Sequence, residues 1–179
     1  ISKMGQYVLM LQLSMLAHAA FRELLGYKTV RELYEDDSIK YLWPQLAIPL
    51  WELSERTGID PTMAYWLYGL NNKRVKNPTL PKNPDNFEPF YTFTGSETEK
   101  WFLAVHHGAE VELAQANDYL LKAHLLSHYE HNALLTKLIE YLNNAAVSSM
   151  QAVDVLKRMR EHLDPFEYFR EVRMFYAFP

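Results

Sequence analysis

The sequence contains no cysteine among its 179 residues, which excludes disulfide bonds, thiolate metal ligands and thiol catalysis. This composition fits a reducing compartment, and we take the cytoplasm as the expected location. The apolar run Val8–Leu16 is interrupted by Gln12 and Ser14 and falls short of the ~20 residues of a membrane-spanning helix. It also lacks the flanks of a signal peptide. We therefore expect no membrane partner.

Glycine is scarce, with 6 residues, whereas aromatic residues make up 14% of the chain. This balance favours large side chains that fill a core or line a cavity, and it argues against disorder. The net charge is −4, and no basic run is longer than 73–76, so the chain has no electrostatic footprint for nucleic acid. The length suits a single domain over residues 1–179.

No segment alternates polar and apolar residues at a period of two, so the predicted fold class is all-α. We expect no internal repeat and no heptad array. Apolar periodicity, caps and prolines predict helices over Met4–Leu25, Thr29–Asp36, Pro49–Arg56, Asp60–Leu70, the Trp101 region to Leu126, Tyr129–Asn143, Ser148–His162 and Pro165–Ala177. Ser148 or Ser149 and Asp164 are the expected caps of the last two helices.

Two stretches that contain several prolines are expected to be irregular. Residues 41–50 carry two prolines and are predicted to form an extended connector. Residues 71–98 carry four prolines and are predicted to form a long crossover without regular structure, which is a candidate cover over a pocket. The chain also begins without methionine and ends just after a helical pattern, so we expect it to be a fragment of a longer protein.

The helix around Trp101 is predicted to be buried on nearly every side, because its apolar residues occupy two faces. Gly108 lies inside this helix at a cost of roughly 1 kcal/mol relative to alanine. The space left by the missing side chain could be needed by a neighbouring helix or by a ligand lying flat against the backbone. His106 and His107 precede the glycine and diverge by about 100° around the helix, so they cannot face one pocket. One is a candidate acid–base group and the other a partner of Glu110, or both are buried histidines satisfied by neighbouring helices.

Three further clusters each allow a functional and a structural interpretation. His124, His128 and His131 share a helix face and could bind a transition metal, although their polar neighbours favour a solvated helix edge. Arg173 follows the aromatic pair Tyr168 and Phe169, where a guanidinium could hold a carboxylate or form a salt bridge. The remaining aromatic cluster could line a ligand pocket or simply pack in the core. It comprises Tyr65, Trp66, Tyr68, Gly69, Trp101 and Phe102.

The order and spacing of several of these residues resemble the indoleamine 2,3-dioxygenase family of haem enzymes. The resemblance spans roughly Tyr41 to Tyr176, and its sharpest part is Asp164-Pro165 followed by Tyr168-Phe169 and Arg173. Its other matching positions are Leu46–Ser54, Tyr65, Asn71 and Trp101–Leu103. The resemblance implies the helical large domain of that fold, incomplete in this chain. It also implies haem b as cofactor and insertion of O2 across the indole C2–C3 bond of tryptophan or a related indole, giving an N-formylkynurenine-type product.

The resemblance also implies roles for individual residues. Arg173 would bind the substrate carboxylate, and Tyr168 and Phe169 would pack on the ring or the haem edge. The inner pocket and the haem surroundings would be lined by Tyr65, Tyr68, Gly69, Trp101, Phe102, Val105 and Gly108. Val105 occupies the position of a small distal hydroxyl residue in mammalian members, with His106 adjacent as the candidate catalytic group.

No histidine of the chain matches the axial haem ligand of this family, which we expect on a segment after Pro179. This leaves three function classes open. They are a haem dioxygenase or a related haem oxygenase acting on another aromatic amino acid, a non-haem metal-binding bundle that uses His124, His128 and His131, and a metal-free helical module.

Overall fold

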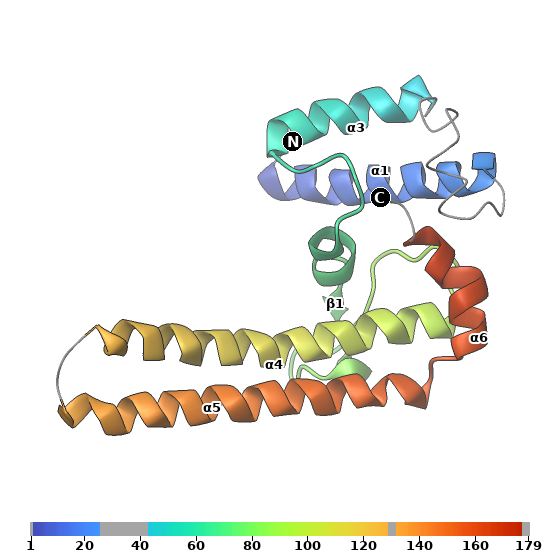
Figure 1. Ribbon diagram of the computed structural model, residues 1–179. Coiled ribbons are helices and arrows are strands. Elements are labelled where there is room, and N and C mark those ends of the chain that lie inside the picture. Colours follow the sequence, from blue (N-terminus) through green and yellow to red (C-terminus); the bar gives the residue numbers. More distant parts are fainter. Residues whose placement is uncertain (1, 26–42, 129–131, 177–179) are drawn as a thin grey trace. The chain divides into compact units, whose positions relative to one another are not determined.

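The structure is a computed structural model that describes residues 2–25, 43–128 and 132–176. Helices dominate these ranges, which confirms the predicted all-α class (Figure 1). The chain divides into two compact units, each described by itself below. The first contains residues 1–72, 90–99 and 164–179, and the second contains residues 73–89 and 100–163. A single domain over the whole chain stays a prediction.

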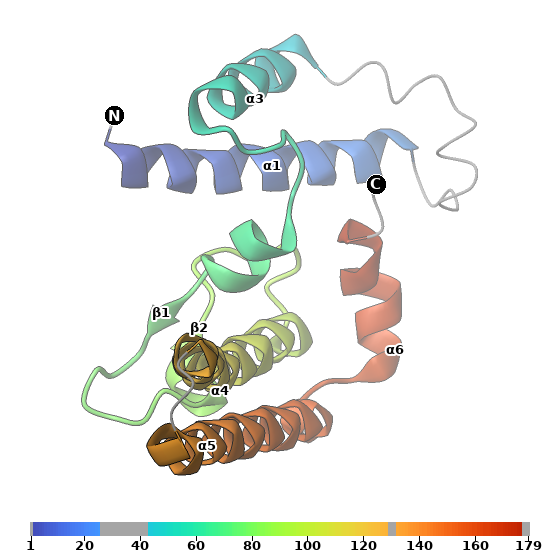
Figure 2. The same ribbon diagram turned by 60° about the vertical axis from the view of Figure 1, so that its left-hand side comes forward.

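In the first unit, helix α1 (Lys3–Leu25) lies beside helix α3 (Pro44–Thr57) (Figures 1 and 2). The prediction for α1 is confirmed, and the prediction for Thr29–Asp36 falls outside the described residues. The buried side of α1 is one face of a helix, because its members recur three and four residues apart. They are Met10, Leu11, Ser14, Met15, Ala17, His18 and Ala20. None of the described helices is long and apolar enough to cross a membrane.

The predicted extended connector at residues 41–50 is wrong over its described part, because α3 already begins at Pro44. Proline is tolerated in the first turn of a helix, where its missing N–H has no intrahelical acceptor. The carbonyl of Trp43 accepts from the amides of Leu46 and Ala47 and closes that turn. Pro49 lies inside the helix and does not open it. The helix ends at Gly58, whose left-handed φ of 69° allows its N–H to donate to the Ser54 carbonyl.

The predicted helix Asp60–Leu70 is also much shorter than expected. Only a π-helical turn, η2 (Trp66–Leu70), forms there, with Tyr65 preceding it. By contrast, the prediction from Pro165 onward is confirmed to Phe175 as α6 (Pro165–Glu167), the π-helical turn η5 (Tyr168–Val172) and the 3-10 turn η6 (Arg173–Phe175). The Asp164 carboxylate accepts from the amides of Phe166 and Glu167, as a helix cap does.

Helix α4 (Glu97–Ser127) belongs to the second unit from Lys100 onward, and there it runs antiparallel beside helix α5 (Asn132–Lys157) (Figures 1 and 2). Contrary to the sequence expectation, small buried residues recur here every seven positions. They are Ala109, Ala116 and Ala123 on α4 and Ala145 and Ala152 on α5. This is the spacing of a coiled-coil seam, and small side chains let two helices approach closely.

The break predicted between Asn143 and Ser148 is wrong, since α5 continues through both residues. Ser148 is buried within the helix instead of capping it. The Ser149 hydroxyl donates to the Ala145 carbonyl four residues earlier, which satisfies a polar side chain in mid-helix. The serine pair therefore does not mark a helix boundary.

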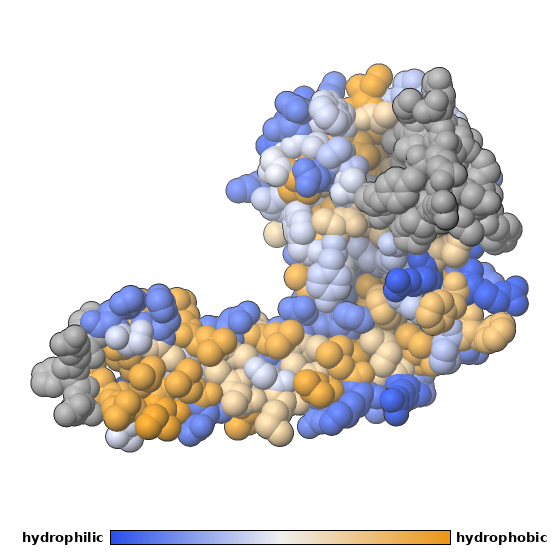
Figure 3. Space-filling model, in the orientation of Figure 1, coloured by the Kyte–Doolittle hydropathy of each residue, from blue (hydrophilic) through white to orange (hydrophobic). Residues whose placement is uncertain are grey.

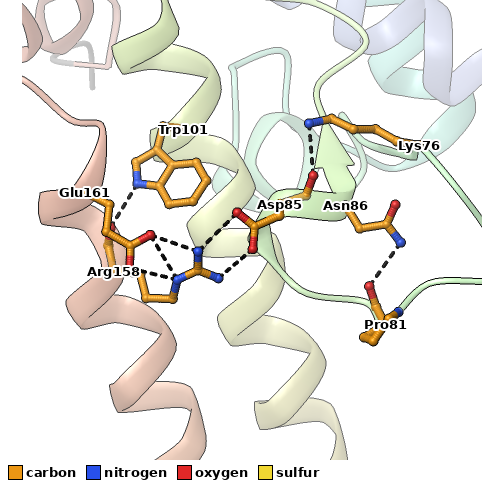
Figure 4. Close-up of polar contacts among 7 residues, drawn as sticks. All are labelled: Lys76, Pro81, Asp85, Asn86, Trp101, Arg158 and Glu161. Atoms are coloured by element: carbon orange, nitrogen blue, oxygen red, sulfur yellow. Dashed lines mark hydrogen bonds and ion pairs between the residues drawn. The ribbon is translucent and has the colours of Figure 1, made fainter.

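The crossover predicted to lack regular structure contains a small antiparallel sheet, in which β1 (Arg74–Val75) pairs with β2 (Phe87–Glu88). A 3-10 turn, η3 (Pro84–Asn86), precedes β2. The Asn86 side chain is buried and donates to the carbonyls of Asn77, Leu80 and Pro81. Figure 4 shows the bond to Pro81. A side-chain amide thus replaces backbone pairing within the loop.

Arg158 is the first residue of the 3-10 turn η4 (Arg158–Glu161), which follows α5, and it binds the 3-10 turn η3. Its guanidinium forms two parallel hydrogen bonds with the Asp85 carboxylate, at 3.0 and 3.1 Å, and also binds Glu161 (Figure 4). Hydrogen bonding to Arg158 lowers the pKa of Asp85. The carbonyl of Arg158 accepts from the Trp101 indole N–H at 3.0 Å. These contacts hold α4, α5 and η3 together around Trp101.

Large apolar side chains remain exposed along the hairpin of α4 and α5, and many gather near its tip (Figure 3). The exposed side chains on α4 are Leu120, Leu121 and Leu125, and those on α5 include Leu135, Ile139, Leu142, Met150 and Val153. A continuous apolar surface of this kind is typical of a helix pair that packs against further protein.

His18 is a buried histidine of the first unit, with both ring nitrogens engaged. Its Nδ1 lies 3.1 Å from the Phe175 carbonyl, and its Nε2 accepts from the Met63 amide at 3.3 Å. Because a carbonyl only accepts and an amide N–H only donates, the neutral tautomer with the proton on Nδ1 satisfies both contacts. Burial lowers the pKa of His18 below its ordinary value of 6.5.

We expect this histidine to make the fold acid-sensitive. Since its pKa is lower in the folded than in the unfolded chain, its stabilising contribution is complete above pH 6.5 and is lost as the pH falls below that value. Urea unfolding of wild type and His18→Gln between pH 5 and pH 8 measures the effect, and the variant should show a shallower loss of stability with acid. His162→Gln at an exposed position is the control. Equal pH slopes for wild type and His18→Gln would contradict the prediction.

Candidate functional site

Three candidate pocket residues lie in or beside the π-helical turn η2, and their exposures differ. Tyr68 is only 3% exposed, whereas Tyr65 is 52% exposed. The Tyr65 ring lies over Gly69, since a Cβ on that glycine would be 2.7 Å from two ring carbons. π-Helical turns are rare and are frequent at functional sites. Tyr65 is therefore the member of this group that reaches the surface, and Tyr68 belongs to the core of the first unit.

Glu99 was not identified as a site residue from the sequence, although its carboxylate accepts four hydrogen bonds. Its carboxylate is fully buried and accepts from the Tyr68 hydroxyl at 2.5 Å. It also accepts from the amides of Phe93 and Thr94 and from the Thr94 hydroxyl, each at 2.7 Å. Burial, followed by the nearby Tyr176 and Glu99, raises the pKa of Tyr68 well above its ordinary value. Tyr68 therefore stays protonated, and its hydroxyl donates a hydrogen bond to the Glu99 carboxylate.

A sequence signal for Glu99 does exist, in Ser96-Glu97-Thr98-Glu99. Serine followed three residues later by glutamate is the capping-box pattern at a helix start. In the structure, the Ser96 hydroxyl accepts from the Glu99 amide at 3.1 Å, as that pattern predicts. The Glu99 carboxylate instead turns to residues 93 and 94 and to Tyr68. The pattern predicts the helix start, and the distant partner Tyr68 is visible only in the structure.

The predicted substrate-binding residues of the last segment lie largely at the surface. Phe169 is 65% exposed, Arg173 is exposed, and Tyr168 is half-buried. The rings of Tyr168 and Phe169 meet edge to face with centroids 6.0 Å apart. Phe169 and Arg173 are four residues apart, so an aromatic ring and a guanidinium follow each other along one segment. The described residues do not enclose Arg173 in a pocket.

The two adjacent histidines of α4 point in different directions, as predicted. His107 is fully buried and meets the Phe87 ring edge to face, with centroids 5.9 Å apart. His106 is half-buried, with its ring 4.3 Å from that of Phe102. The Phe102 carbonyl lies 2.7 Å from His106 Nδ1 and must accept the bond, so in the neutral ring Nε2 is the acceptor. Pairing of the second histidine with Glu110 stays a prediction.

The positions predicted to face a cofactor are occupied by the protein's own core. Val105 is 0% exposed and packs in one cluster with Phe87, Trp101 and Ala104. A Cβ at Gly108 would lie 2.8 Å from the Pro84 ring and 3.1 Å from Val155. The space beside this glycine is taken up by the Pro84 ring of η3 and by Val155 of α5. The face of α4 that carries Val105 and Gly108 therefore does not fit a haem macrocycle.

The candidate histidine metal site is only partly described. His124 and His128 place their Nε2 atoms 3.4 Å apart on an exposed surface, and His131 lies outside the described residues. Within the described ranges, no group of three or more histidine, aspartate or glutamate side chains is arranged to hold a metal ion. The non-haem metal alternative therefore gains no support from the described residues.

Comparison with known proteins places these residues in a family. The family model described as indoleamine 2,3-dioxygenase matches residues 12–178. Indoleamine 2,3-dioxygenase 1 of Mus musculus and that of Rattus norvegicus are each 30% identical over 168 residues, which is 92% of this chain and 39% of each relative. Indoleamine 2,3-dioxygenase 2 of Mus musculus is 26% identical over 162 residues, 89% of this chain and 38% of its own length. The chain thus spans about two fifths of the curated relatives it matches, and it belongs to the indoleamine 2,3-dioxygenase family.

Proposed function

We propose that the chain contributes the substrate-binding segment of a haem-dependent dioxygenase that inserts both atoms of O2 across the C2–C3 bond of tryptophan or a related indole. The family match over residues 12–178 supports the reaction class. The observation that carries the proposal is the exposed pair of Phe169 and Arg173, four residues apart on a segment capped by Asp164. Such a pair offers an apolar ring and a cation to an aromatic amino acid.

In this proposal Arg173 binds the substrate carboxylate through parallel N–H donors, as guanidinium groups bind planar anions. Phe169 and the half-buried Tyr168 offer ring surfaces to the indole. Tyr65, at the surface of η2, is the pocket residue that can contact a ligand directly. Tyr68 and Gly69 are both buried, so in this proposal they support Tyr65 and do not contact the ligand.

Haem b is the cofactor that membership of this family implies. Val105 and Gly108 do not fit it, so we assign no step of the reaction to haem at those positions. His106, in the second unit, remains the candidate catalytic residue, and its Nδ1 donates to the Phe102 carbonyl. Trp101 is engaged with the Arg158 carbonyl and acts as a core residue.

The test is reconstitution of the full-length protein with haemin, followed by absorption spectroscopy and measurement of oxygen consumption. We expect a Soret band, tryptophan-dependent O2 uptake, and a product that carries two atoms from ¹⁸O2. Incorporation of one labelled atom would indicate a hydroxylating haem oxygenase acting on an aromatic amino acid instead. Absence of a Soret band, or a band without indole-dependent O2 uptake, would overturn the proposal.

A further inference from the structure

The segment that carries Arg173 is held at both of its ends by the first turn of α4. We propose that Thr98 and Glu99 are positioning residues that fix residues 164–176, and thereby set where Arg173 presents its guanidinium. The importance of this for substrate binding depends on the proposed function, whereas the mechanical role of the two residues does not. All of the residues involved belong to the first unit.

Thr98 holds the beginning of the segment. It is 2% exposed, and its hydroxyl donates to the Glu167 carboxylate. The same hydroxyl accepts from the Asp164 amide at 3.3 Å. Asp164 in turn caps the helix through a 2.8 Å bond from the Phe166 amide. One buried hydroxyl thus fixes both the cap residue and the first turn of α6.

Glu99 holds the end of the segment through two aromatic rings. Its carboxylate binds the Tyr68 hydroxyl and the Phe93 amide, which fixes both residues. The Phe93 ring stacks on Phe175 with centroids 4.2 Å apart and an interplanar angle of 5°. The Tyr68 ring lies 5.3 Å from that of Tyr176. Since Phe175 and Tyr176 follow Arg173 directly after Met174, these contacts set the backbone beyond the arginine.

Helix α1 adds a second anchor to the same end. The Arg22 guanidinium donates to the Glu171 carbonyl at 2.8 Å and lies 4.2 Å from the centre of the Phe175 ring. The Phe175 carbonyl accepts from His18. Backbone on both sides of Arg173 is therefore fixed while its side chain stays exposed. A rigid backbone under an exposed binding group lowers the ordering cost of ligand binding.

A fully buried carboxylate is unfavourable unless hydrogen-bond donors satisfy its oxygen atoms. Glu99 meets that condition with four donors from three residues. Three of these donors come from the loop before α4 and one from η2. The carboxylate therefore defines one arrangement of three chain segments, which an apolar side chain of the same size would not do.

Hydrogen exchange tests the mechanical role without any need for turnover. Thr98→Val should raise exchange about tenfold at the amides of residues 166–168, and Glu99→Gln should do so at residues 174–176. Amides in the middle of α5 should be unchanged in both variants. Glu97→Gln, an exposed carboxylate in the same turn, is the matched control. If Glu99→Gln does not fold, Tyr68→Phe removes one of the four donors and should affect the same end.

Kinetics of the haem-reconstituted protein tests the link to substrate. Both variants should raise the KM for tryptophan several-fold and leave that for tryptamine, which lacks the carboxylate, nearly unchanged. In an Arg173→Ala background the effect on tryptophan should disappear. Exchange that is unaltered at both ends, or that rises uniformly over the protein, would overturn the positioning role. Equal losses for both substrates would overturn the link to Arg173, and a wild type without turnover would contradict the proposed function alone.

Discussion

Replacement of Arg173 by alanine is expected to raise the KM for tryptophan about 10- to 100-fold and to change that for tryptamine little. A hydrogen-bonded pair between a guanidinium and a carboxylate contributes about 1.5–3 kcal/mol, and each 1.4 kcal/mol corresponds to a factor of ten. Since tryptamine has no carboxylate, its binding does not depend on this contact. Steady-state oxygen uptake with both substrates measures the two effects, with substrate dissociation constants to confirm that KM reports binding.

The matched control is Arg170→Ala, an exposed arginine one turn earlier on the same segment. It removes the same charge from the surface, so a purely electrostatic attraction of the substrate would weaken in both variants. We expect the KM values of Arg170→Ala for tryptophan and tryptamine to equal those of wild type. Equal changes for tryptophan and tryptamine in Arg173→Ala would show that the arginine supports the segment and does not bind the carboxylate.

Replacement of Gly108 by alanine is expected to lower the free energy of unfolding by about 1–2 kcal/mol. The new methyl group would lie 2.8 and 2.9 Å from two carbons of the Pro84 ring and 3.1 Å from Val155. Overpacking of this kind costs about 1–3 kcal/mol, of which the better helix propensity of alanine offsets up to about 1 kcal/mol. Pro84 is fully buried and its ring is stiff, so it cannot move aside as a flexible side chain would.

Gly69→Ala provides the contrast for this prediction. A Cβ there would also meet an atom at 2.7 Å, but that atom belongs to the Tyr65 ring, which is 52% exposed and can rotate outward. We expect the free energy of unfolding to change by less than about 0.5 kcal/mol. Urea denaturation of both variants at neutral pH measures the difference. A free energy of unfolding of Gly108→Ala equal to that of wild type would contradict the tight packing described for α4.

The elements that local patterns specify strongly could be predicted from the sequence. Helix α1 and helix α4 were placed within a few residues, because each has a long apolar periodicity. The Asp164-Pro165 pair was correctly identified as a helix start. The family was also identified, since the order of Tyr168, Phe169 and Arg173 carries that information without any coordinates.

Helix boundaries were predicted wrongly where a residue can take either of two local conformations. Proline at position 44 can end an extended segment or open a helix, and here it opens α3. Ser148 can cap a helix or lie within one, and here it is buried in the middle of α5. Asp60-Pro61 carries a start signal, yet the regular turn begins only at Trp66. In each case the local pattern allowed both states, and tertiary packing selected one.

The amino-acid sequence alone determined the helical class and the family, because periodicity, caps and motif order are local properties of a chain. The tertiary structure alone decided that Gly108 accommodates Pro84 and Val155, and that Glu99 joins Tyr68 to the loop before α4. Contacts between residues far apart in the chain leave no periodic trace in it. For that reason the side chains that position Arg173 are found only in the folded molecule.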